Sequence, residues 1–181
     1  MASAFAHIGA AVVIGEVCFR QRLPRRVWWL GAVCSVLPDL DVIGFFVGIP
    51  YAHVMGHRGF THSLAFAALW SGVLVATLRY TYGEGAGLTL FPYIFLCTVS
   101  HGVLDAMTDG GLGVAFFAPW NNERYFLPWR PLKVPPIGIY AFFSRRGLVV
   151  LGSELLWVAL PLVLIAAVNV ALRRRSNSRR G

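Results

Sequence analysis

The sequence predicts an all-α integral membrane protein, a helical bundle of about five transmembrane helices with a long loop after the fourth. Hydrophobic residues make up 57% of the 181 residues and charged residues 13%. The mean hydropathy of +0.64 is far from that of a soluble domain. Five apolar runs, each near the ~20 residues needed to cross the hydrocarbon core, follow one another without a long polar segment. We therefore expect residues 1–181 to form one membrane-embedded domain.

The first two apolar runs span about residues 3–19 and 27–49. The loop between them holds four arginines, Arg20, Arg22, Arg25 and Arg26. Arginines crowded beside apolar runs are typical of a cytoplasmic loop. The second run contains LPDLD (residues 37–41), where Pro38 can break the helix. No cationic segment precedes the first run, so we expect a retained helix rather than a cleaved signal peptide.

The third and fourth runs span about residues 62–82 and 88–107, and the glycine-rich stretch 83–87 predicts a turn between them. A connection of roughly 40 residues follows, which is too long for a simple turn and too aromatic for a disordered linker. We expect it to fold over the polar groups. The last run, about 148–171, ends in a basic tail that begins at Arg173.

Charge favours one orientation of these five spans. An odd number of spans places the termini on opposite sides, and the arginine loop and the C-terminal tail then share the cytoplasmic side. All clusters of polar residues at the run ends fall on the outer side. Much of the formal net charge of +8 lies beside apolar runs, which indicates lipid headgroup contacts, so we expect no nucleic acid partner.

Histidines and aspartates at the ends of the apolar runs are candidate metal ligands. They are His7, Asp39, Asp41, His57, His62, His101 and Asp105. His101 and Asp105 are four residues apart in a helical run, so their side chains share one face. An ionisable pair within a membrane helix is costly unless it faces a cavity, a partner or a metal. Mixed imidazole and carboxylate ligands predict one or two divalent ions, with zinc first and manganese or iron as alternatives.

Each of these clusters also has a structural alternative. Asp39 and Asp41 could cap a helix end, and a single histidine such as His7 more often serves as a satisfied polar residue. Gly59 breaks the segment between His57 and His62 and frees both rings to point inward.

Two arginines are candidate catalytic residues that would hold a charged headgroup, Arg58 and Arg124. The fixed fork of a guanidinium matches a phosphate better than lysine does. For Arg58 the alternatives are a headgroup anchor or an ion pair with Asp39 or Asp41. Thr61 and Ser63 lack a third orienting group, so we expect them to hydrogen-bond ligands rather than act as nucleophiles.

At these motifs the sequence resembles the bacterial membrane-bound, predicted metal-dependent hydrolases of the YdjM type, which are described as LexA-regulated. The matching pieces are LPDLD (37–41), HRGFTHS (57–63) and SHGVLD (100–105), and more loosely PW (119–120) with RY (124–125). The resemblance implies a multi-pass protein of the bacterial inner membrane. This family is in turn similar, at a distance, to zinc phospholipase C and related nucleases, which cleave phosphoesters.

That distant likeness implies His101 and Asp105 as ligands, completed by His62, His7 and one of Asp39 and Asp41. The chain lacks the late HxxxE pair of those relatives, so one or two metal ions are expected rather than three.

Three functions follow as hypotheses. The first is a metal-dependent hydrolase whose activated water cleaves the phosphoester of a lipid or lipid-linked substrate. With the orientation above, its active site would face the periplasm. The second is an ion-binding transporter, against which the absence of an internal repeat counts. The third is a non-catalytic stress-response membrane protein whose polar cluster holds the helices together.

Overall fold

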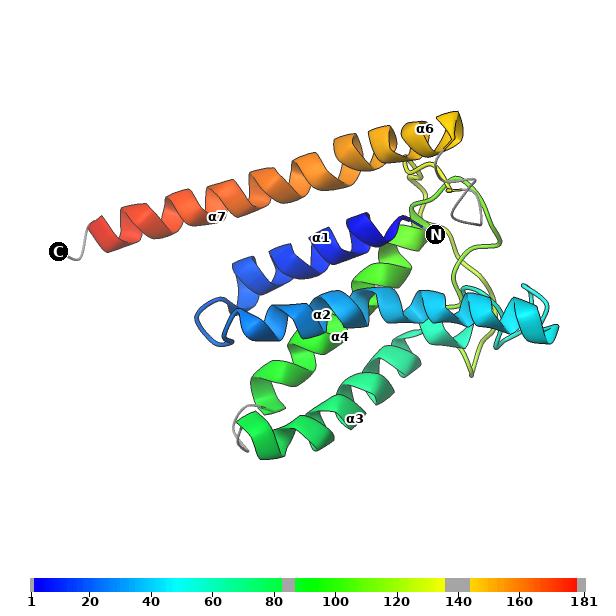
Figure 1. The fold of residues 1–181 in the computed structure, drawn as a ribbon, viewed down its shortest axis with the longest axis horizontal. Helices are drawn as coiled ribbons and strands as arrows, with labels where there is room; N and C mark the ends of the chain where they lie inside the picture. The colour runs from blue at the N-terminus through cyan, green and yellow to red at the C-terminus, as the bar shows by residue number, and fades with distance from the viewer. Residues whose placement is uncertain (1, 83–86, 136–143, 179–181) are drawn as a thin grey trace.

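The computed structural model describes residues 2–82, 87–135 and 144–178 (Figure 1). It contains α1 (Ala4–Ile14) with a π-helical turn (Gly15–Phe19), α2 (Arg26–Val36) with a 3₁₀ segment (Leu37–Val47), a 3₁₀ turn (Phe60–His62), α3 (Leu64–Tyr82) and α4 (Gly87–Ala106). Helix α6 (Arg145–Glu154) continues through a π-helical turn (Leu155–Ala159) into α7 (Leu160–Ser178). Within these ranges, β structure is limited to two isolated bridges. The all-α class is therefore confirmed.

The five apolar runs all form helices, but their lengths differ. By length and composition, three helical stretches can cross a membrane: Arg26–Val47, Gly87–Ala106 and Arg145–Arg175. The apolar stretches Ala4–Phe19 and Leu64–Arg79 are shorter. The helical membrane bundle is thus confirmed, while the count of five spans stays a prediction. The expected turn at 83–87 lies outside the described residues except for Gly87, and so does the tail beyond residue 178.

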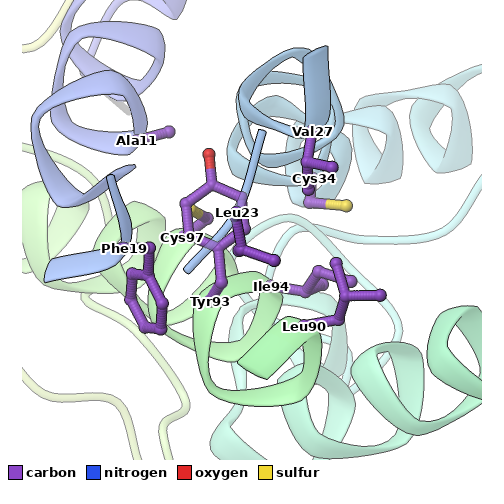
Figure 2. Packing of buried hydrophobic residues seen from close by; sticks show 9 residues of the cluster. All are labelled: Ala11, Phe19, Leu23, Val27, Cys34, Leu90, Tyr93, Ile94 and Cys97. Atoms are coloured by element: carbon purple, nitrogen blue, oxygen red, sulfur yellow. The ribbon is translucent and has the colours of Figure 1, made fainter. Parts of the chain in front are cut away.

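Helices α1, α2 and α4 pack together around Tyr93, whose side chain is fully buried (Figure 2). Phe19, Leu90 and Ile94 belong to the same apolar cluster. Helix α2 approaches α4 closely at Gly31, where an added Cβ would lie 2.2 Å from the Tyr93 hydroxyl oxygen. Glycine is therefore the residue that lets these two helices meet.

The last helix, α6 with α7, lies along the outside of the bundle next to α1 (Figure 1). Only 6% of its most apolar stretch is buried, so most of its surface is available to lipid. Near its C-terminal end, Arg173 donates to the carbonyl oxygens of Glu16 and Val17. This contact brings the end of the last helix to the arginine loop, while the N-terminus lies at the opposite end of the bundle (Figure 1).

The described part of the connection after α4, residues 107–135, packs against the N-terminal end of the bundle. Its backbone pairs Val114 with Tyr125 and donates from Ala115 to the carbonyl oxygen of Arg58. There is no room for a side chain at Gly59, because an added Cβ would lie 2.1 Å from the Val54 carbonyl oxygen. The connection and the glycine-containing segment 56–62 therefore close over the candidate ligands, as the sequence predicts.

Candidate metal centre

Four of the seven predicted ligands converge on one point: Asp39, His62, His101 and Asp105. One ligand atom from each lies within 4.8 Å of the others, and all four residues are buried. They come from the 3₁₀ segment after α2, the turn before α3, and the C-terminal end of α4. His101 and Asp105 share one face of α4, as their spacing predicts, and their Nε2 and Oδ2 atoms are 3.9 Å apart.

The orientation of His101 follows from the change from α-helix to 3₁₀ geometry at Leu37, where Pro38 stands in the first turn. His101 Nδ1 lies 2.7 Å from the carbonyl oxygen of Ser35, and because a carbonyl can only accept, Nδ1 carries the proton. In a 3₁₀ register the donor to that carbonyl would be residue 38, and proline has no N–H. The carbonyl is thus left to His101, and the His101 Nε2 lone pair points toward Asp39 Oδ1, 3.3 Å away.

His62 is oriented in the same way by Asp41. Its Nδ1 lies 3.2 Å from Asp41 Oδ2, which leaves Nε2 facing His101 Nε2 at 3.0 Å. Histidine ligands of metals commonly donate their other ring nitrogen to a carboxylate or a carbonyl in this manner. Carboxylate oxygens of Asp39, Asp41 and Asp105 lie 3.2 to 3.8 Å from the His62 ring nitrogens, and negative charges this close favour a cation at the centre.

Asp41 sits at the centre of a second group with His57 and His62. It accepts from His57 Nδ1 at 2.6 Å, from the Thr61 hydroxyl at 2.7 Å and from the Arg58 backbone N–H at 3.1 Å. One ligand atom from each of Asp41, His57 and His62 lies within 4.8 Å of the others, so this group could hold a second ion, and the Asp41 contacts also orient His62 for the first group. Thr61 Oγ1 also lies 3.0 Å from His62 Nδ1, so Thr61 contacts a candidate ligand as the sequence predicts, whereas Ser63 Oγ accepts from the backbone N–H of Phe66.

His7 lies beside the group of four but does not belong to it. Its ring stacks on that of His101 with centroids 3.8 Å apart, and its Nε2 is 3.7 Å from Asp105 Oδ1. Among the described residues, neither of its ring nitrogens has a hydrogen-bond partner, although the side chain is fully buried. The structure therefore keeps one more imidazole next to the centre.

Arg58 is fully buried and faces inward. Its Nε lies 3.1 Å from Asp105 Oδ2, and its other nitrogens donate to the Gly110 carbonyl oxygen and the Thr108 hydroxyl. The sequence predicts Asp39 or Asp41 as the alternative ion-pair partner of Arg58, and the partner in the structure is Asp105 instead. A positive φ of 63° at this non-glycine residue is held by the backbone bonds to Asp41 and Ala115. The position does not leave the guanidinium open to a headgroup.

Arg124 also serves the protein itself. It donates to the carbonyl oxygens of Tyr51, His53 and His57, and its guanidinium lies 5.6 Å from the centre of the Tyr51 ring. These bonds fasten the 50–58 loop to the connection after α4. Arg124 thus holds the segment that carries His57.

Two features of the centre are absent from the sequence reading. The Ser35 carbonyl could have been found from Pro38 three residues later, since proline leaves that acceptor open. The second is the backbone N–H of Ala2, which donates to Asp105 Oδ1 at 2.6 Å. The sequence could not have predicted this contact, because nearly every amino acid carries a backbone N–H.

Charge within the described residues favours a divalent cation. Asp39, Asp41 and Asp105 supply three carboxylates, and the one arginine or lysine in direct contact with them is Arg58. The carboxylates therefore outnumber the arginine that contacts them, and all three are largely buried. Asp39 Oδ1 is buried without a hydrogen-bond partner among the described residues. Imidazole and carboxylate donors with these lone pairs fit zinc, manganese or iron.

The fold and the site together define a class: a helical membrane protein with a buried histidine and aspartate cluster that can bind a metal ion. Residues 1–177 match the YdjM inner membrane protein family, so the chain belongs to that family. It is 36% identical over 165 residues to the inner membrane protein YbcI of Escherichia coli (strain K12). The aligned region covers 91% of this chain and 95% of YbcI. No solved structure matches the chain.

Proposed function

We propose that the protein is a metal-dependent hydrolase of the inner membrane that cleaves a phosphoester of a lipid or lipid-linked substrate. The observation that carries the proposal is the convergence of four buried ligand atoms from Asp39, His62, His101 and Asp105. A bound divalent ion, with zinc as the first candidate, would supply a Lewis acid that activates water and polarises a phosphoryl oxygen.

The chain's own residues would hold this chemistry in place. Ser35 and Asp41 fix the tautomers of His101 and His62, so both Nε2 lone pairs face the same point. Arg58 forms a buried ion pair with Asp105, which positions the carboxylate and partly compensates its negative charge. Asp39 is the ligand whose side chain keeps some exposure, 8%, against 0% for the other three.

Hydrolysis is tested with protein purified in detergent and loaded separately with Zn²⁺, Mn²⁺ or Fe²⁺. We expect turnover of phospholipids or polyprenyl phosphates in at least one metal form, and its loss in His101→Ala and Asp105→Ala. The exposed residue His53 supplies a matched control, since His53→Ala removes an imidazole outside the cluster.

Two outcomes would contradict the proposed hydrolase activity, and each would favour another function for the bound ion. Stoichiometric metal without turnover of any phosphoester would make the ion structural and remove the hydrolase. Ion-dependent uptake into vesicles without turnover would favour the transporter.

The proposed periplasmic position of the site is tested by labelling single cysteines in a variant without Cys18, Cys34 and Cys97. We expect a cysteine at the exposed position Asn121 to react with an impermeant maleimide in intact spheroplasts. One at Arg22 should react only after lysis, because the proposed orientation places the arginine loop on the cytoplasmic side. The reverse pattern would move the centre to the cytoplasmic face.

A further inference from the structure

The last helix carries a buried carboxylate, Glu154, at the end of α6. Most of this helix exposes its surface to lipid, yet Glu154 is only 5% exposed. Its Oε1 accepts from the backbone N–H of Ser3 at 2.5 Å, and its Oε2 accepts from the Ser3 hydroxyl. An ionisable side chain in a membrane helix is costly and usually functional, so the partner of Glu154 indicates its role.

Ser3 is the N-cap residue of α1, and Glu154 completes this cap from another helix. The Ser3 side chain makes no capping bond to its own helix, and the first turn of α1 contains no acidic residue. In the capping box, a glutamate at the third helical position accepts from the N–H of the N-cap residue, and its charge stabilises the positive end of the helix dipole. The third position of α1 is Ala6. Glu154 therefore supplies the acceptor and the charge that the first turn of α1 lacks.

The cap continues into the candidate metal centre through Ala2, the residue before Ser3. The Ala2 backbone N–H donates to Asp105 Oδ1 at 2.6 Å, and the Ala2 side chain is fully buried. The other oxygen of this carboxylate, Oδ2, faces the centre and lies 3.5 Å from His62 Nε2. Two neighbouring backbone N–H groups thus join Glu154 to a candidate ligand, and a shift of this segment would turn the Asp105 carboxylate.

We propose that Glu154 is a positioning residue of the metal centre. It fixes the start of α1, and through the Ala2 N–H it sets the orientation of the Asp105 carboxylate. The proposal rests on the metal site of the proposed function and extends that site to the last helix. By this connection the last helix contributes to metal affinity without contributing a ligand.

The affinity of Glu154 variants for Zn²⁺, measured by competition with a chromophoric chelator, tests this proposal. Glu154→Leu keeps a similar volume but removes both acceptors, and we expect it to weaken binding about tenfold, the scale for a residue that orients a ligand. Glu154→Gln keeps an acceptor for the Ser3 N–H and can donate to the Ser3 hydroxyl oxygen, so the affinity should stay within about threefold of the wild type.

Val150→Ala is the matched control, since Val150 is fully buried on the same face of α6 one turn before Glu154. Its truncation should lower stability through the cavity it leaves but keep Zn²⁺ affinity within about twofold. Co²⁺ bound in place of Zn²⁺ has a visible spectrum that depends on its ligands. Glu154→Leu should change this spectrum, and Val150→Ala should not.

Ser3→Ala makes a smaller change, because it removes one of the two bonds to Glu154. It should weaken Zn²⁺ binding by a smaller factor than Glu154→Leu. Unchanged affinity in either of these two variants, or an equal loss in Val150→Ala, would overturn the proposal. Failure of the proposed function looks different: wild-type protein that binds Zn²⁺ but cleaves no phosphoester leaves this proposal intact, whereas wild-type protein without Zn²⁺ affinity would overturn both.

Discussion

The two ends of the bundle use the same three helices, α1, α2 and α4, in opposite ways. Toward the arginine loop these helices pack apolar side chains around Tyr93 (Figure 2). Toward the N-terminus they and the segments next to them bring together His7, Asp39, His101 and Asp105. The apolar end is stabilised by close packing of side chains, as where Tyr93 packs against Gly31. The second depends on named partners for each polar atom, so its stability is coupled to what it binds.

Truncating the centre of the apolar end should have the largest effect on stability. Tyr93→Ala removes a fully buried ring, and the cavity should cost about 3 kcal/mol or more of unfolding free energy. Folded protein should keep its metal, because Tyr93 is not part of the centre. Reversible unfolding in mixed micelles measures the first quantity and elemental analysis the second. Leu88→Ala, at an 88% exposed position, is the control and should change stability by less than about 0.5 kcal/mol.

Breaking the ion pair at the polar end should come next. Arg58→Met keeps much of the side-chain volume but leaves Asp105 without its guanidinium, which should cost about 3 kcal/mol in metal-free protein. Bound metal should recover part of that loss, since the cation replaces the missing positive charge. Arg130→Met, at an exposed position, should cost less than about 1 kcal/mol. If Arg58→Met lowers the unfolding free energy equally with and without metal, the ion pair is not coupled to metal binding at the centre.

A smaller effect is expected at Asp41, which supports His62 without belonging to the group of four. Asp41→Asn should weaken metal binding about 10- to 100-fold without abolishing it, the usual scale for a hydrogen-bond partner of a ligand. Asp39→Asn should lose more, because it changes a ligand atom. Asp109→Asn alters an exposed pair with Lys133 and should leave metal affinity unchanged. Competition with a chromophoric chelator measures all three, and equal losses at Asp39 and Asp41 would make Asp41 a ligand.

The smallest effect is expected from His53→Ala. His53 is exposed, and its ring accepts a hydrogen bond from the Met55 backbone N–H within its own loop. Metal content and stability should match the wild type within error. A clear fall in metal content would show that the centre extends into the 50–58 loop.

The sequence predicts the apolar runs and the ligand types well, because both depend on local composition. The shared face of His101 and Asp105 and the meeting of the polar ends of the runs follow from spacing and from the alternation of spans. At Pro38 the helix changes from α to 3₁₀ geometry and continues, where the sequence predicts a break. Sequence could not tell which aspartate joins His101 and Asp105 and which joins His57. Asp39 and Asp41 have the same side chain two residues apart, and their roles differ through contacts with His57, Thr61 and Arg58.

The roles of Arg58 and Arg124 also depend on distant contacts. Arg58 reaches Thr108 and Gly110 in the connection after α4, while Arg124 reaches back to the 50–58 loop. These partners are 50 or more positions away along the chain, so no motif around either arginine reveals them. A guanidinium that would suit a phosphate equally suits a buried carboxylate or a set of carbonyl oxygens.

The most direct measurement of the central claim is the metal content of the protein purified from cells grown in standard medium, without added chelator. Elemental analysis should give about one equivalent of a divalent transition metal, with zinc first, in the wild type and in His53→Ala. The same analysis should give less than a tenth of that in His101→Ala and Asp105→Ala, since a ligand removed from a four-residue centre takes most of the affinity with it. Metal-free wild-type protein that also fails to bind zinc, manganese or iron when titrated would contradict the account.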